Sequence, residues 1–125
     1  MEMLDAGADV LFAAGGETAD SVLQAAAGGG AFVIGAETDA YAHLEDVRPW
    51  LLTSAVSDVR SGVRDLLEAA RRGKMPAGEI YGKVDLAPTH ELESQISGEA
   101  LSRLEKIRAG IEAGEILVNV PYRLP

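Results

Sequence analysis

The sequence contains no cysteine, which excludes a disulfide framework, a thiolate metal site and a cysteine nucleophile. This absence leaves the redox compartment of the protein open. Long hydrophobic runs are also missing, because no apolar stretch approaches the ~20 residues that a membrane-spanning helix needs. The opening residues, MEMLD, are short and acidic. We therefore expect no signal peptide within the chain, and any export signal would lie outside it.

Positive charge is scarce. The 11 Lys and Arg residues stand against 20 Asp and Glu residues, which gives a net charge of -9 at pH 7. So acidic a chain is a poor partner for nucleic acid or for an anionic membrane surface. Its hydrophobic content of 47% over 125 residues is instead typical of one globular domain with a real core.

Enzyme motifs are absent as well. The sequence has no G-x-S-x-G elbow, no P-loop and no H-E-x-x-H pair. The glycines at 28–30 follow a predicted helix rather than a strand, which does not suit a dinucleotide-binding loop. His43 and His90 lie far apart in predicted loops and have no cysteine near them, so they make a poor metal site. We therefore predict a binding protein with no catalytic residues, no metal and no cofactor.

Two apolar runs are the main features of the sequence. Residues 8–14 are apolar apart from Asp9, and residues 31–36 contain no polar side chain, as expected of strands buried on both faces of a parallel sheet. The segment 18–27 between them has helical character and predicts a right-handed crossover. Ligands of open α/β sheets bind beyond the carboxyl ends of the strands. We therefore expect Gly15-Gly16 and Glu37-Thr38-Asp39 to lie side by side on one functional edge.

The rest of the sequence continues the alternation of predicted strands and helices. We expect a polar loop over 41–49, a strand over 50–56, and a helix that Ser57 or Asp58 caps and Gly73 ends. A half-exposed strand over 80–86, a helix over 98–113 and a terminal strand over 116–120 complete the pattern. The fold class predicted is α/β, with a Rossmann-like parallel sheet and flanking helices.

Five segments together carry a family resemblance. In chain order they are GADVLFAAGG (7–16), VIGAETD (33–39), LLTSAV (51–56), GEIYG (78–82) and GEILV (114–118). The chain resembles the C-terminal part of the basic membrane protein (BMP) family of ABC-transporter substrate-binding lipoproteins. That resemblance implies a partial type I periplasmic-binding fold, in which two lobes close on a ligand.

The resemblance also implies a function. The family's known ligands are largely purine nucleosides, so we expect a small polyhydroxylated ligand and an ABC permease as partners of the complete protein. It implies an extracytoplasmic protein anchored as a lipoprotein. Residues 1–125 would form a single partial domain like the second lobe, and the helix over 58–73 would cross to the first. Without that lobe, the apolar faces of the helices predict self-association.

The resemblance assigns ligand contacts residue by residue. Gly15 and Gly16 match the family's glycine pair beside the sugar, although a plain strand-to-helix turn explains them equally well. Glu37 stands where the family has the aspartate that holds ribose hydroxyls; the alternative is a solvated loop carboxylate. Asp39 is a second candidate carboxylate two residues further on.

Two more candidates have competing structural roles. Ser57 falls where nucleoside-binding members usually carry a lysine, and we expect it to cap the following helix instead. Phe12 faces either the ligand cleft or the core, and the core is favoured. The alternative function is a cytoplasmic ligand-sensing regulatory domain of the same fold; an enzyme of Rossmann-like architecture is a weaker third choice.

Overall fold

The computed structural model describes residues 2–78 and 82–118. The chain divides into two compact units, Met1–Leu92 and Glu93–Pro125, and we take each by itself. The expectation of a single partial domain over residues 1–125 stays a prediction.

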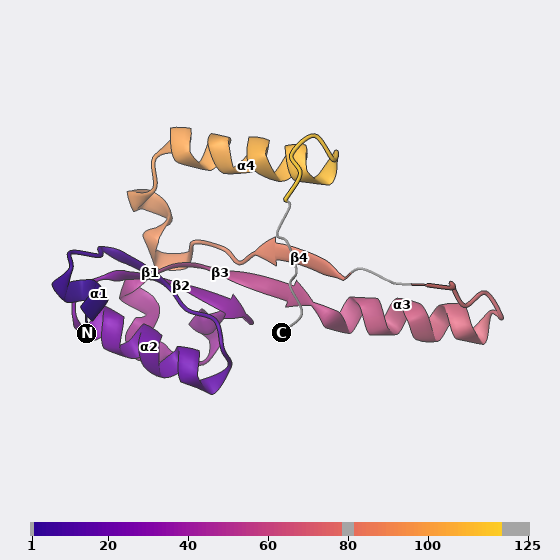
Figure 1. Cartoon of the computed structure of the whole chain (residues 1–125), viewed down its shortest axis with the longest axis horizontal. Coiled ribbons are helices and arrows are strands. Elements are labelled where there is room, and N and C mark those ends of the chain that lie inside the picture. The colour runs from indigo at the N-terminus through magenta and orange to yellow at the C-terminus, as the bar shows by residue number, and fades with distance from the viewer. Residues whose placement is uncertain (1, 79–81, 119–125) are drawn as a thin grey trace. The chain divides into compact units, whose positions relative to one another are not determined.

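A four-stranded sheet in the order β1-β2-β3-β4 forms the centre of the first unit (Figure 1). Its first three strands are parallel, and β4 runs antiparallel to β3 at the edge. The predicted α/β class is confirmed, with the antiparallel edge strand as an addition. The elements of this unit are α1 (Glu2–Asp5), β1 (Val10–Phe12), α2 (Glu17–Gly28), β2 (Phe32–Glu37), the 3-10 helices η1 (Ala40–Ala42) and η2 (Glu45–Trp50), β3 (Leu51–Asp58), α3 (Val59–Arg71) and β4 (Lys83–Leu86).

The central prediction of adjacent parallel strands is confirmed. Val10 pairs with Phe32 and Phe12 with Ile34 in a parallel register, and α2 connects the two strands. Beyond them, Glu37 at the end of β2 pairs with Val56 of β3. The carboxyl ends of all three parallel strands therefore meet at one edge of the sheet.

One face of this sheet holds the core. Its members come from β1, β2, β3, α2, the 3-10 helices and the residues that adjoin them. The largest fully buried side chains are aliphatic, apart from Ser54. The segment 41–49, expected to be a loop, belongs largely to η1 and η2. Short 3-10 turns need only i→i+3 bonds, so Pro49 near the end of η2 is tolerated. The core residues are Leu11, Ala13, Ala19, Leu23, Ala26, Ala27, Ala31, Val33, Ala40, Leu44, Val47 and Leu51.

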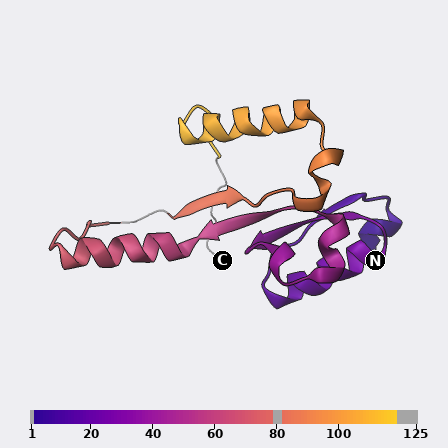
Figure 2. The same ribbon diagram turned by 180° about the vertical axis from the view of Figure 1, so that it is seen from behind.

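Helix α3 begins directly where β3 ends and extends away from the sheet (Figures 1 and 2). Asp58 is its N-cap, and its Oδ1 accepts a hydrogen bond of 3.0 Å from the Ser61 backbone N–H. Of the two caps predicted, Asp58 is confirmed, and the expectation that Ser57 takes this role is wrong. Ser57 is still part of β3, where it pairs with Val84, and the carboxylate one residue later is placed to reach the helix N–H.

The second unit contains helix α4 (Gly98–Glu112), which begins at the N-cap Ser97. The Ser97 hydroxyl accepts a hydrogen bond of 3.2 Å from Ala100 N–H. The 3-10 helix η3 (His90–Gln95) spans the boundary between the units. A terminal strand was predicted over 116–120, but residues 116–118 form no strand, and residues 119–120 lie outside the described residues. The first two residues of the strand predicted over 80–86 also lie outside them.

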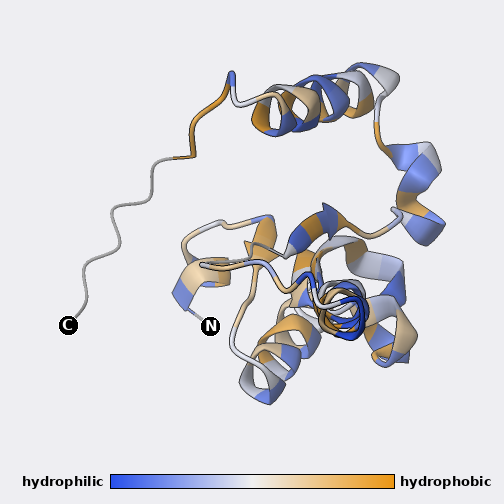
Figure 3. Ribbon diagram, turned by 90° about the vertical axis from the view of Figure 1, so that its right-hand side faces the viewer, coloured by the Kyte–Doolittle hydropathy of each residue, from blue (hydrophilic) through white to orange (hydrophobic). Residues whose placement is uncertain are grey.

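The apolar faces of the two helices remain largely uncovered. On α3, Val59, Val63 and Leu67 are 65%, 50% and 63% exposed. Figure 3 shows hydrophobic and hydrophilic residues alternating along α4, whose Leu104, Ile107 and Ile111 are also exposed. Within residues 2–78 and 82–118, no helix is both long and apolar enough to cross a membrane.

We predict that the apolar stripe on α3 mediates self-association, because stable monomers rarely leave such contiguous apolar surface exposed. Sedimentation velocity should show association that weakens in Leu67→Gln. Glu68→Gln is the matched control: it changes only an exposed ion pair with Arg72 on the same helix. A folded monomer at all concentrations would contradict this prediction.

We predict that α3 depends on the Asp58 cap and loses that support in acid. Hydrogen bonds from the Ser61 side chain and backbone lower the pKa of the Asp58 carboxyl below its ordinary 3.8. A lowered folded pKa means that the stabilisation is present above pH 3.8 and disappears as the pH falls through the folded value. Circular dichroism should show less helix in Asp58→Ala at pH 7, whereas Ser57→Ala should match the wild type. Equal losses in both variants would refute the assignment of the cap.

Candidate functional site

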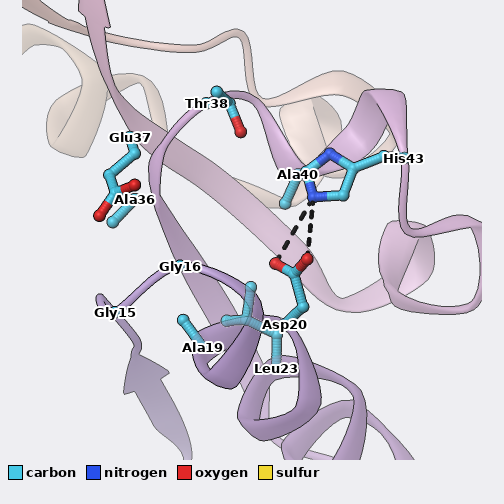
Figure 4. Close-up of a pocket in the computed structure, with 10 residues that line it drawn as sticks. All are labelled: Gly15, Gly16, Ala19, Asp20, Leu23, Ala36, Glu37, Thr38, Ala40 and His43. Carbon is cyan, nitrogen blue, oxygen red and sulfur yellow. Dashed lines mark hydrogen bonds and ion pairs between the residues drawn. The ribbon is translucent and has the colours of Figure 1, made fainter.

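A hollow of about 190 Å³ opens at the carboxyl ends of β1 and β2, beside the start of α2 (Figure 4). Its floor is apolar and its rim is polar. The predicted pairing of the two strand ends is thus confirmed, because both glycines and the first two residues of the predicted carboxylate turn line one hollow. The lining residues are Gly15, Gly16, Ala19, Asp20, Leu23, Ala36, Glu37, Thr38, Ala40 and His43.

The glycine pair shapes one side of the hollow. Gly15 has φ of 139° and Gly16 has φ of 59°, a combination that only glycine adopts readily. Gly16 is the N-cap of α2 and offers no side chain to bond the first helical N–H groups. This turn therefore leaves backbone open toward the hollow at the positive end of a helix.

Glu37 lies opposite, at the end of β2, and its backbone φ is 71°. A positive φ is uncommon at a residue other than glycine, and strained backbone, which costs about 1–3 kcal/mol for a residue, clusters at functional sites. The Glu37 carboxylate has no hydrogen bond or ion pair with any residue that the structure describes. Glu37 therefore has an unfavourable backbone conformation, and nothing in the described part of the chain uses its acceptor oxygens.

Sequence reasoning missed a third pair of side chains in the hollow. Asp20 lies in the first turn of α2, and His43 lies just after η1. Their side chains meet, with His43 Nε2 3.4 Å from Asp20 Oδ2 and 3.5 Å from Oδ1 (Figure 4). The two residues are 23 positions apart, and only the packing of α2 against the 3-10 helices brings them together. The sequence held no local signal for this pair.

Asp39, the second predicted carboxylate, does not line the hollow. It is the N-cap of η1, and its Oδ1 accepts a hydrogen bond of 3.2 Å from Tyr41 N–H. Its Oδ2 lies 2.8 Å from His90 Nε2. Whether Asp39 touches a ligand stays a prediction, since the structure gives it a clear role in holding the turn that carries Glu37 and Thr38.

His90 and Tyr41 extend this support. Their rings stack with centroids 3.9 Å apart, and Arg48 lies over the Tyr41 ring at 4.7 Å. The Tyr41 hydroxyl donates a hydrogen bond of 3.0 Å to Glu91, which raises the pKa of the tyrosine. The segment that follows β4 is thus attached to the turn that follows β2.

Two predicted ligand contacts lie elsewhere. The expectation that Phe12 is a core residue is wrong: its side chain is 60% exposed. In the three-residue strand β1 the burial alternates, and Leu11 alone points into the core. Neither Phe12 nor Ser57 lines the hollow. Their role as ligand contacts stays a prediction.

The comparisons identify the fold. An ABC transporter system solute-binding protein from Conexibacter woesei DSM 14684 has a similar structure, with a TM-score of 0.67 at 22% sequence identity. The match covers 99% of this chain and 39% of that one, so the chain spans well under half the length of that protein. At this identity the likeness establishes the fold. A scan of protein-family models and a search of curated proteins found no match.

The groups around the hollow suit binding. Carboxylates, an imidazole and a hydroxyl can exchange hydrogen bonds with a hydroxylated ligand. Over the described ranges 2–78 and 82–118, no three His, Cys, Asp or Glu side chains gather as ligands of one metal ion would. The arrangement therefore offers hydrogen-bond partners on an apolar floor.

We predict that the buried Ser54 hydroxyl holds this edge together. It accepts a hydrogen bond of 3.1 Å from Ala40 N–H and lies 3.4 Å from Asp39 Oδ1. Ser54→Ala would leave the Ala40 N–H buried without a partner, which costs about 1–3 kcal/mol. Urea denaturation should show this loss, and the exposed Ser21→Ala should change little. Equal stability of Ser54→Ala and wild type would contradict the role of this hydroxyl.

Proposed function

We propose that the chain is part of a solute-binding protein of an ABC transporter and binds a small polyhydroxylated ligand at the hollow beside α2. One observation carries this proposal: Glu37 lines the hollow in a strained backbone conformation, and its carboxylate pairs with none of residues 2–78 and 82–118. Strain of this kind persists where the surrounding structure fixes it, and it is common at ligand sites. The fold shared with the Conexibacter protein supports the same assignment.

The small size of the hollow supports a ligand site that this chain shares with a second lobe. Complete pockets for small molecules measure about 300–1,000 Å³, which exceeds the 190 Å³ found here. We infer that this chain contacts one part of the ligand, such as a sugar, and that a second lobe covers the rest. In this proposal α3 crosses toward that lobe, which accounts for its exposed apolar stripe.

The finer assignment follows the sequence resemblance. We propose a BMP-type lipoprotein outside the cytoplasm that binds a purine nucleoside, closes over it and delivers it to a membrane permease. Glu37 would accept hydrogen bonds from two vicinal sugar hydroxyls, a task suited to an ionised carboxylate. Gly15 and Gly16 would bring backbone close to the sugar. Ser57 replaces the lysine usual in nucleoside-binding members.

We predict that Glu37→Gln weakens nucleoside binding by roughly 10- to 100-fold, because a hydrogen bond to a charged group is worth about 1.5–3 kcal/mol. Calorimetric titration of adenosine, guanosine and inosine into the complete protein that contains this chain, and into its variants, tests this. The exposed Glu45→Gln removes the same charge away from the hollow and is the matched control. Ser57→Lys, which restores the family's usual residue, should improve binding.

Each outcome of the titration is informative. Tight binding that Glu37→Gln leaves unchanged would refute the site while leaving a solute-binding function in place. Binding of none of the three nucleosides by any variant would refute the nucleoside assignment.

A further inference from the structure

Two residues with strained backbone are joined through one carboxylate. In the described ranges 2–78 and 82–118, two residues other than glycine have a positive φ: Glu37, at 71°, and His90, at 44°. Asp39 connects them, because it lies two residues after Glu37 and its Oδ2 is 2.8 Å from His90 Nε2. Backbone strain persists only where surrounding contacts fix it, and it is concentrated at ligand sites and switches. The connection therefore indicates that the two strained residues serve one purpose.

Glu37 lies at the centre of a three-residue turn. The Thr38 N–H donates a hydrogen bond of 2.8 Å to the Ala36 carbonyl oxygen. With a positive φ at its central residue, this is the pattern of the γ-turn, which is rare and strained. One ordinary hydrogen bond contributes less than such strain costs. Contacts outside the turn must therefore hold it, and Asp39 follows it directly.

The Asp39 carboxylate is fixed through both of its oxygens. Its Oδ1 accepts a hydrogen bond of 3.2 Å from Tyr41 N–H and lies 3.4 Å from the Ser54 hydroxyl. Its Oδ2 faces His90. Because an ionised carboxylate can only accept, Nε2 of His90 carries the proton of this bond. The side chains are only 21% exposed at His90 and 28% exposed at Asp39, so water competes little with the bond.

His90 is itself held in place by its own segment. Its ring stacks on Tyr41, with centroids 3.9 Å apart and 13° between the ring planes. Three residues earlier, the Ala87 carbonyl accepts a hydrogen bond of 2.6 Å from the Thr53 hydroxyl. The Ala87 N–H donates another of 2.8 Å to the Ser54 carbonyl. The segment after β4 is thus attached to β3, and His90 is a fixed donor for the turn after β2.

We propose that His90 is a positioning residue for the candidate ligand site. Through Asp39 it holds the strained turn that presents Glu37 to the hollow. This inference rests on the proposed function, in which Glu37 contacts the ligand. It adds a residue that does not line the hollow and that the sequence resemblance does not assign. Because such coupling is reciprocal, a ligand that fixes Glu37 also strengthens the Asp39–His90 hydrogen bond.

Hydrogen exchange at the Thr38 amide, measured by NMR, tests this link without a ligand, because this N–H closes the turn at Glu37. His90→Phe keeps a ring that can stack on Tyr41 but removes the donor, whereas His90→Gln keeps a donor. Exchange at Thr38 should be roughly 10- to 100-fold faster in His90→Phe, as expected from the loss of one hydrogen bond to a charged group. It should return toward the wild-type rate in His90→Gln.

Asp46→Asn is the matched control, since it alters a carboxylate that pairs with Gln24 away from this turn. It should leave the exchange of the Thr38 amide unchanged. Equal exchange at Thr38 in His90→Phe and in the wild type would overturn the inference. An equal rise at the amides of α2 would overturn it too, because it indicates general destabilisation. Exchange as fast in His90→Gln as in His90→Phe would refute the role of the donor.

Calorimetric titration of adenosine into the complete protein that contains this chain separates this inference from the proposed function. His90→Phe should weaken binding by about tenfold, and His90→Gln should restore most of the affinity. Adenosine binding that His90→Phe leaves unchanged would overturn the positioning role alone. Absence of adenosine binding in the wild type and every variant would overturn the nucleoside assignment, and the exchange at Thr38 would still decide whether His90 holds the turn.

Discussion

The arrangement of the sheet edge where β1 and β2 end depends on the buried hydroxyl of Ser54. Ser54 lies opposite Gly35 in the β2–β3 register, and a Cβ at Gly35 would come within 2.7 Å of its oxygen. A glycine at that position therefore lets the hydroxyl reach Ala40 N–H and the Asp39 carboxylate. These contacts fix the turn after β2, and that turn carries Glu37, Thr38 and the start of η1. The positions of Glu37, Thr38 and Ala40 in the lining of the hollow follow from this packing.

Part of this arrangement could be predicted from the sequence. The apolar runs identified β1 and β2, and the rule that parallel strands end at one edge brought Gly15-Gly16 together with Glu37. Such features are local: each depends on the composition of a short segment. The pattern of apolar residues also predicted α3 and α4 with boundaries close to those observed.

Other features depended on contacts that no local pattern encodes. Asp20 meets His43, and Asp39 meets His90 across 51 positions, only after the 3-10 helices pack against α2 and β3. The errors were of a different kind. Phe12 is hydrophobic but lies on the exposed side of a three-residue strand. Asp58 caps α3 in place of the neighbouring Ser57, because β3 continues through both residues.

The central claim is that the hollow beside α2 is the ligand site. Titration of the 15N-labelled protein with adenosine, followed by amide NMR, tests it most directly because it locates the contact. The account predicts chemical-shift changes concentrated at Gly15, Gly16 and residues 36–43. Shifts confined to α3, or to the second unit, would contradict it.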